Sequence, residues 1–164
     1  MISIRVAKIA VVFCCSWIAG LPGINNLLDY NVNLQFVQHV FMMDSLAFEP
    51  SVVSWRSIHS PIIHHLAYLF LIFTELSIFV LGLWGSHDLW KARYDAVLFN
   101  RRKSKAVWAM LLGIFLWILA FMVVGGEWFL MWLSEDWNAV QSAFRYSVPF
   151  LFGLVLLTIE DKEF

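Results

Sequence analysis

Glu75 is the residue whose chemistry stands out first, because it is a carboxylic acid inside a long apolar segment. If a helix begins near Pro61, Glu75 lies about 21 Å along it at about 1.5 Å per residue, inside a hydrocarbon layer about 30 Å thick. An acidic side chain at that depth costs about 2.5–3.5 kcal/mol, so it needs a partner or exchanges a proton. His64 and Tyr68 share its helical stripe. We expect either a proton or ligand path over these three residues, or a neutral Glu75 hydrogen-bonded to another helix.

A second group of polar residues would meet at one end of a helical bundle. Ala106, Gly113 and Ala120 recur at seven-residue intervals, which is typical of a closely packed helix face. The same interval reaches Glu127 and therefore aims it toward the bundle interior. One interpretation is a structural network in which Glu127 pairs with an arginine; the other is a pocket, open to the periplasmic side, for a small or anionic group. The candidate outer cluster comprises Asn25, Asn26, Asp29, Arg56, His59, His65, Glu127 and Arg145.

The sequence does not favour a metal centre or a cofactor. His64 and His65 are neighbours about 100° apart on a helix, unlike the i, i+4 histidine pair of helical zinc sites. Haem ligation would need histidines on two facing spans, and only His39, in a loop, could supply the second one. Cys14 and Cys15 are adjacent and provide no disulfide framework. We therefore expect no metal and no cofactor, and an enzyme, such as a quinone-handling one, is the less favoured hypothesis.

Composition places the chain in a membrane. Of its 164 residues, 61% are hydrophobic and 14% are charged, and the mean hydropathy is +0.75. A soluble domain contains about 45–50% apolar and about 25% charged residues. Nine tryptophans and fifteen phenylalanines agree, because aromatic residues gather at membrane interfaces. These values exclude a soluble enzyme and a disordered protein, and the net charge of −1 excludes a nucleic-acid partner bound through a basic face. The expected surroundings are a lipid bilayer.

Four segments have the length and apolar character of spanning helices, at about 9–28, 61–86, 106–126 and 143–159. The sequence therefore predicts an all-α, four-helix transmembrane bundle formed by a single integral membrane domain over residues 1–164. The long outer loop between the first two helices is expected to be partly helical, because Leu34, Val37 and Val40 have helical spacing. The first segment could instead be a signal peptide, but no small-x-small cleavage site follows it, which favours an uncleaved helix.

Basic residues indicate the orientation of the bundle. Only Arg56 and Arg145 fall on the side that carries Asp29, Asp44, Glu49, Glu127, Glu135 and Asp136. Because positive charge collects in the cytoplasm, both termini are expected there, and the protein is expected to be a multi-pass protein of the bacterial inner membrane. The cytoplasmic basic residues are Arg5, Lys8, Lys91, Arg93, Arg101, Arg102, Lys103, Lys105 and Lys162.

Several motifs, in order along nearly the whole chain, resemble a bacterial family of predicted small integral membrane proteins of unknown function. The resemblance implies a four-helix bacterial inner-membrane protein, and it implies no activity, cofactor or catalytic residue. The motifs are 25–30 (NNLLDY), 36–40 (FVQHV), 55–56 (WR), 61–65 (PxxHH), 99–101 (FNR), 125–132 (GGEWFLMW) and 137–138 (WN).

Two functions remain open at the level of sequence. The favoured one is a non-catalytic accessory or interaction subunit that docks a membrane protein partner, or a second copy of itself, through an aromatic periplasmic face at Trp128, Trp132 and Trp137. The alternative is a small-ligand-binding protein or transporter that uses the outer cluster and Glu75. A cavity between the outer loop and Glu75 would favour ligand handling, whereas a packed interior would favour the subunit.

Overall fold

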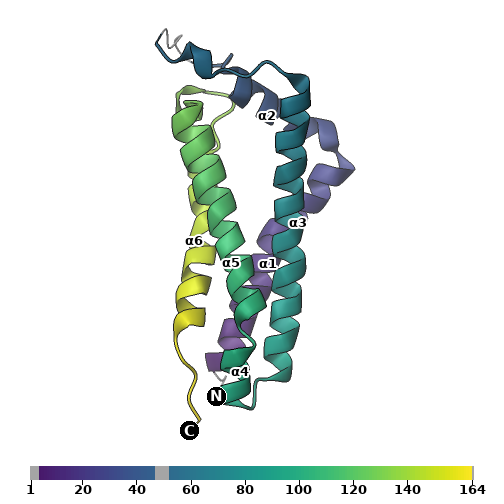
Figure 1. Cartoon of the computed structure of the whole chain (residues 1–164), viewed down its shortest axis with the longest axis vertical. Helices are drawn as coiled ribbons and strands as arrows, with labels where there is room; N and C mark the ends of the chain where they lie inside the picture. Colours follow the sequence, from purple (N-terminus) through teal and green to yellow (C-terminus); the bar gives the residue numbers. More distant parts are fainter. Residues whose placement is uncertain (1–3, 47–51, 164) are drawn as a thin grey trace.

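Helices make up nearly all of the part of the chain that the computed structural model describes, residues 4–46 and 52–163. Four helical stretches within these residues are long and apolar enough to cross a membrane: 4–28, 61–91, 96–128 and 140–158. They confirm the predicted all-α bundle, an elongated column in Figure 1. Glu49, which we assigned to the outer loop, lies outside the described residues. The elements are α1 (Ile4–Leu28), α2 (Tyr30–Met42), η1 (Ser54–Arg56), α3 (Pro61–Lys91), α4 (Ala96–Arg101), α5 (Ser104–Ile114), η2 (Phe115–Trp128), η3 (Met131–Leu133) and α6 (Val140–Thr158).

Helix α3 packs between α1 and α5, and glycines determine how closely it approaches each neighbour. Pro61 occupies its first turn, where a missing amide hydrogen leaves no helical hydrogen bond unmade. On the side of α1, a Cβ atom added at Gly23 would lie 3.0 Å from Cβ of Glu75. On the side of α5, a Cβ atom added at Gly85 would lie 2.7 Å from the backbone nitrogen of Ala106. The two glycines therefore allow three helices to pack closely, one of them directly against Glu75.

The third span changes its helix type part-way along. The α-helix α5 continues without a break into η2, a π-helix of 14 residues. Ala106 and Gly113 are buried in α5, as a packing stripe requires, but Ala120 is only half-buried and Glu127 is exposed. The prediction that Glu127 points into the bundle is therefore wrong. A π-helix bonds i to i+5 and holds more residues per turn than an α-helix, so a seven-residue stripe rotates away from its first face.

Helix α2 lies at the end of the bundle opposite the termini (Figure 1). Its residues Leu34, Val37 and Val40 are buried, in agreement with the helical spacing of the loop sequence. Leu34 and Val37 pack against Tyr68 of α3, whereas Val40 packs against Phe129, which follows η2. This helix therefore bridges the second and third spans.

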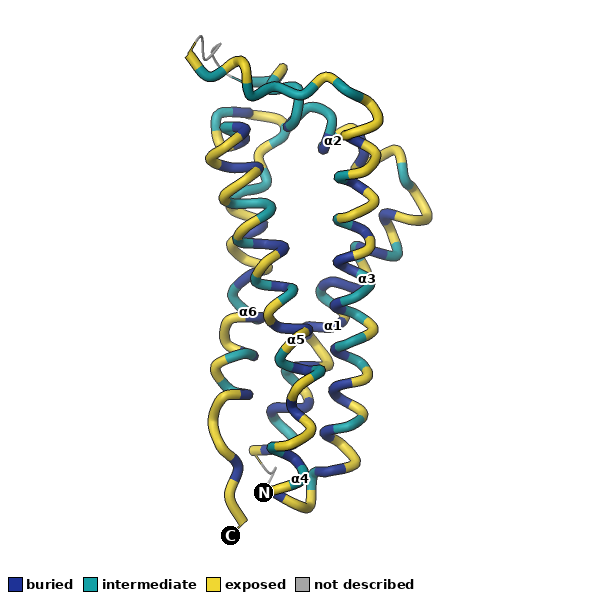
Figure 2. The backbone as a smooth tube through the Cα atoms, viewed as in Figure 1, coloured by how far each residue is buried: buried dark blue, intermediate teal, exposed yellow. Residues whose placement is uncertain are grey.

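The outward surface of the bundle is apolar. Buried residues lie mainly on the inward faces of the helices and exposed ones on the outward faces (Figure 2). Large exposed side chains on the spans include Phe70, Phe73 and Trp108. In an integral membrane protein this surface meets lipid chains, so its apolar character follows from the bilayer alone.

Both termini lie at one end of the column, which we call the termini end (Figure 1). There the tail after α6 is held by buried charges: Lys8 Nζ and Lys103 Nζ each lie 2.8 Å from Oδ2 of Asp161. Asn100 donates to the backbone oxygen of Asp161 at 2.8 Å. Burial alone would raise the pKa of the Asp161 carboxyl, but the hydrogen bonds and charges of the two lysines outweigh burial and hold that pKa below its ordinary range.

Candidate functional site

Glu75 lies near the middle of α3 with only 2% of its surface exposed. Asn26 of α1 donates a hydrogen bond from Nδ2 to Oε2 of Glu75 at 2.8 Å. Asn33 of α2 donates in turn from Nδ2 to Oδ1 of Asn26 at 2.6 Å. Asn26 is the one hydrogen-bonding partner of Glu75 within the described residues. A single carboxyl group is therefore held by two amides in series, which connect three helices.

Glu75 borders a cavity of about 250 Å³, which we call the polar compartment. Its carboxyl and amide groups come from Asn26, Asn33 and Glu75, two tyrosines also line it, and the rest of its wall is aromatic or aliphatic. No lysine, arginine or histidine is among its lining residues, all of which the structure describes. The lining residues are Pro22, Asn26, Asn33, Phe36, Val37, Tyr68, Leu71, Glu75, Trp117, Phe121, Ala139 and Tyr146.

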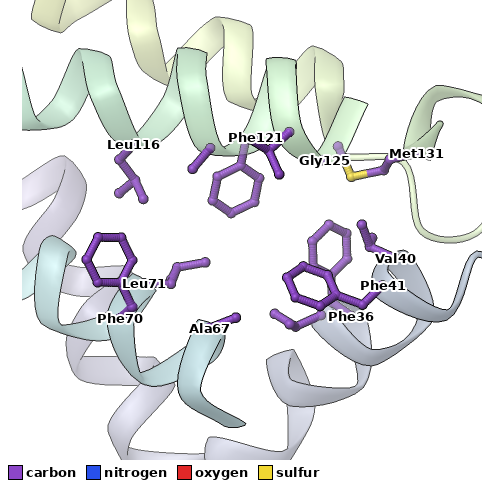
Figure 3. Close-up of a pocket in the computed structure, with 13 residues that line it drawn as sticks. Phe36, Val40, Phe41, Ala67, Phe70, Leu71, Leu116, Phe121, Gly125 and Met131 are labelled. Carbon is purple, nitrogen blue, oxygen red and sulfur yellow. The ribbon is translucent and has the colours of Figure 1, made fainter. Parts of the chain in front are cut away.

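A second cavity of about 200 Å³, the apolar compartment, lies between α3 and η2 with α2 across one end. Figure 3 shows α2 and α3 side chains on one side of it and η2 side chains on the other. Phe70 and Val124 line it and are also exposed on the outer surface of their helices. The compartment therefore reaches the surface that faces lipid. Its lining residues are Phe36, Val37, Val40, Phe41, Ala67, Phe70, Leu71, Leu116, Ala120, Phe121, Val124, Gly125 and Met131.

The two compartments share part of their walls. Phe36, Val37, Leu71 and Phe121 line both. The rings of Phe36 and Phe121 stack with centroids 6.2 Å apart, and both residues line both spaces. The result is an apolar space beside a space that contains a carboxyl group, which suits a molecule with one polar and one apolar part.

Trp117 of η2 lines the polar compartment and carries an unsatisfied donor. Its side chain is 5% exposed, and its Nε1 is buried with no hydrogen-bonding partner among the described residues. Its ring stacks on Tyr146 of α6 with centroids 4.7 Å apart and packs on Phe121 at 5.1 Å. A buried N–H group without a partner costs about 1–3 kcal/mol.

The predicted stripe of His64, Tyr68 and Glu75 is buried along one side of α3, but its members bind different partners. His64 Nε2 donates to the backbone oxygen of Ile58 at 2.8 Å. Tyr68 donates its hydroxyl to the backbone oxygen of Asn26 at 3.4 Å. Within the described residues no side-chain hydrogen bond joins one member of the stripe to another. The proton path therefore stays a prediction, whereas the hydrogen bond from another helix to Glu75 is present.

The residues of the predicted outer cluster are dispersed. Asn26 belongs to the polar compartment, whereas Asn25 and Asp29 are exposed at the end of α1. His65 is exposed and shares a hydrogen bond of 2.9 Å with the hydroxyl of Tyr30. The remaining cluster members form no single site with these residues.

The predicted pair between Glu127 and an arginine is absent from the described residues, because Glu127 and Arg145 are both exposed and neither forms an ion pair there. Arg56 lies instead over the ring of Trp128, with its guanidinium carbon 4.6 Å from the centroid. His59 shares a hydrogen bond of 3.2 Å with the Ser57 hydroxyl. The rotation caused by η2 explains why Glu127 is out of reach of a partner inside the bundle.

The described residues contain no group of three histidine, cysteine, aspartate or glutamate side chains arranged to hold a metal ion. His64 and His65 point to different partners, as their 100° separation on the helix requires. The chemistry of the two compartments is therefore that of one carboxyl group, two amides, two tyrosine side chains and further aromatic faces.

Comparison with known families agrees with this architecture. The family model of predicted small integral membrane proteins (DUF2165) matches residues 4–160. The chain belongs to this family. No curated protein and no solved structure matches it. As a DUF2165 member it is an integral membrane protein with four candidate spans, and the family description assigns it no reaction.

Three residues of the polar compartment in this DUF2165 protein were not singled out from the sequence: Asn33, Trp117 and Tyr146. Asn33 follows Asn26 by seven residues, and the hydrogen bond between them depends on how α2 folds back after α1. Trp117 and Tyr146 lie among many aromatic residues in apolar segments. Composition gives no signal that distinguishes an aromatic side chain that lines a cavity from one that meets lipid.

Proposed function

We propose that this DUF2165 protein binds a small amphipathic molecule within the bilayer. The polar part of the molecule would lie beside Glu75, and its apolar part would lie in the apolar compartment. The observation that carries the proposal is the position of a buried carboxyl group on the wall of a cavity, with one amide partner and no basic residue in the lining. Buried ionisable residues in membrane spans typically mark binding or transport sites.

The volumes of the two compartments support a small ligand. Volumes of about 200 and 250 Å³ lie below the lower end of the range of about 300–1,000 Å³ that is usual for drug-sized ligands. Entry from the side is favoured by Phe70 and Val124, which line the apolar compartment and also meet the lipid-facing surface. A molecule dissolved in the bilayer would reach this opening without crossing an aqueous phase.

Photoaffinity labelling tests the proposal. The protein in phosphatidylcholine vesicles is illuminated with octanol that carries a diazirine, and the labelled residues are identified by mass spectrometry. We expect labelling of Leu71 and Phe121, which line both compartments, above that of the lipid-facing Phe73. Ala120→Phe fills the apolar compartment and should abolish the excess labelling, whereas Ala10→Phe, on an exposed position of α1, should not. Labelling that is uniform over lipid-facing and cavity residues would contradict the proposal.

A non-catalytic accessory subunit is the second candidate, and one feature favours it. Trp55 is 70% exposed and packs edge-on against the exposed Trp128, with Arg56 over both rings. Tryptophan and arginine are frequent in the centres of protein interfaces. A photoreactive amino acid at position 55 should then crosslink, in native membranes, to one reproducible membrane protein or to a second copy of the chain. Recovery of the uncrosslinked protein alone would count against this candidate.

We also propose that the protein lies in the bacterial inner membrane with both termini in the cytoplasm. The support is the distribution of basic residues, because the loop between α3 and α5 and both chain ends lie at the termini end and carry most of them.

A further inference from the structure

The charges around the polar compartment restrict the chemistry of its ligand. Glu75 is the one lining residue that can carry a full negative charge at neutral pH, and the lining contains no basic residue to balance it. A buried carboxyl group without a basic partner either holds a proton or pairs with a positive charge brought by a ligand. An anionic ligand would instead place two like charges together in a medium of low dielectric constant.

The aromatic side chains of the polar compartment also favour a cationic ligand. On the side of η2 and α6, Trp117 stacks on Tyr146 and packs at a tilt against Phe121. Tyr68 lines the compartment from α3. Organic cations are attracted to the faces of such rings when they lie within about 6 Å of the centroid, most strongly for tryptophan. A carboxyl group together with several aromatic faces is a suitable surrounding for an alkylated ammonium group.

We propose that the ligand is an amphipathic organic cation, whose ammonium group lies beside Glu75 among the aromatic side chains of the polar compartment and whose alkyl chain enters the apolar compartment. The inference rests on the proposed function and narrows it from amphipathic molecules in general to cationic ones.

The cation and a proton compete for the same carboxyl group. The titratable side chains that face Glu75 across the compartment are Tyr68 on its own helix and Tyr146 on α6. Helices α1 and α2 present Asn26 and Asn33, and η2 presents aromatic side chains. Glu75 is the one carboxyl group in this lining, so acidification should weaken binding of the cation by placing a proton on Glu75.

Competition with the photoreactive octanol tests this inference. Octyltrimethylammonium is compared with its uncharged isostere, 2,2-dimethyldecane, at equal mole fractions in phosphatidylcholine vesicles. We expect the cation to displace the label from Leu71 and Phe121 at a mole fraction about tenfold lower than the isostere does. Glu75→Gln should remove this difference and its pH dependence, whereas Glu127→Gln, at an exposed carboxylate, should retain both.

Each outcome decides between the two proposals. If both compounds displace the label equally from the natural protein and specific labelling is otherwise intact, the proposal of a cationic ligand is wrong. The proposal that the protein binds an amphipathic molecule would remain. An absence of specific labelling would remove both proposals. Glu75→Asp keeps the charge and provides a second variant if Glu75→Gln does not elute as a single species, and it should keep the preference for the cation.

Discussion

Asn26 connects three helices through the polar atoms of one residue. Its side chain donates to Glu75 on α3 and accepts from Asn33 on α2, and its backbone oxygen accepts from Tyr68. In a protein interior the cost of such groups arises mainly when one partner is removed, because the other is then buried without a hydrogen bond. At the scale of single residues, the position of Glu75 therefore depends on an amide that carries no charge.

Replacement of Asn26 should consequently destabilise the protein more than replacement of its neighbour. Asn26→Ala leaves buried polar atoms of Glu75 and Asn33 without their partner, and we expect a loss of about 1–3 kcal/mol. Asn25→Ala changes an exposed side chain and should alter stability by no more than about 0.5 kcal/mol. Thermal unfolding in detergent, followed by circular dichroism, measures both. Equal melting temperatures for the two variants would show that the amide does not stabilise the site.

At the scale of elements, the meeting of α3 and α5 depends on a close backbone approach. A Cβ atom at Gly85 would lie 2.7 Å from the backbone nitrogen and 3.0 Å from Cα of Ala106. A backbone cannot move aside as a flexible side chain can, so the two helices themselves would have to separate. The same added atom at Gly125 of η2 would meet Met131 at 3.4 Å, an ordinary contact distance.

Gly85→Ala is therefore expected to destabilise the protein by about 1–3 kcal/mol, as overpacking of a close interface does. Gly125→Ala is the matched control, and it should leave the melting temperature close to that of the natural protein. Both substitutions add one methyl group to a glycine within a span, and alanine favours a helix more than glycine does, so a comparable loss of stability in both would show that the contact between α3 and α5 is not its cause.

The tail after α6 is the second element whose stability can be tested. Asp161→Asn leaves Lys8 and Lys103 buried without their common carboxylate, and breaking a buried ion pair in this way costs about 3–5 kcal/mol. Because the pKa of Asp161 is lowered by folding, its contribution to stability is present above the ordinary pKa of an aspartate and is lost as the pH falls through the lowered value.

Thermal unfolding between neutral pH and about pH 3 measures this contribution, since an ordinary aspartate titrates near about 3.9. We expect the natural protein to lose stability on acidification and Asp161→Asn to start lower and lose less. Glu160→Gln changes the exposed neighbouring carboxylate and should follow the natural protein. A pH dependence that is identical in all three proteins would exclude Asp161 as its origin.

At the scale of the whole molecule, the spans could be predicted from sequence because the bilayer requires long apolar helices. The burial of Glu75 within the second span could be predicted in the same way, from its position in a long apolar helix. The cavity could not be predicted, because it depends on α2 folding back so that Val37 and Asn33 reach α3 and α1. The inward direction of Glu127 was predicted wrongly because a seven-residue repeat assumes an α-helix, and η2 has a different number of residues per turn.

The proposed orientation gives a prediction for the whole molecule. Single cysteines at Glu135, between η3 and α6, and at Arg102, between α4 and α5, lie at opposite ends of the bundle. In a background without Cys14 and Cys15, a membrane-impermeant maleimide added to intact spheroplasts should label the cysteine at position 135. The cysteine at position 102 should be labelled only after the membrane is opened. The opposite pattern would reverse the orientation of the protein.

The contacts at the termini end determine which substitutions the tail after α6 can accept. Lys8 and Lys103 donate to the backbone oxygen of Ile159, Asn100 to that of Asp161, and Arg5 to that of Lys162. These are contacts with the peptide backbone, which every amino acid supplies. Substitutions at positions 159 and 162 should therefore be tolerated, whereas deletion of one residue between Thr158 and Asp161 would displace each carbonyl group and the Asp161 carboxylate together. The length of this segment is constrained more strictly than its composition.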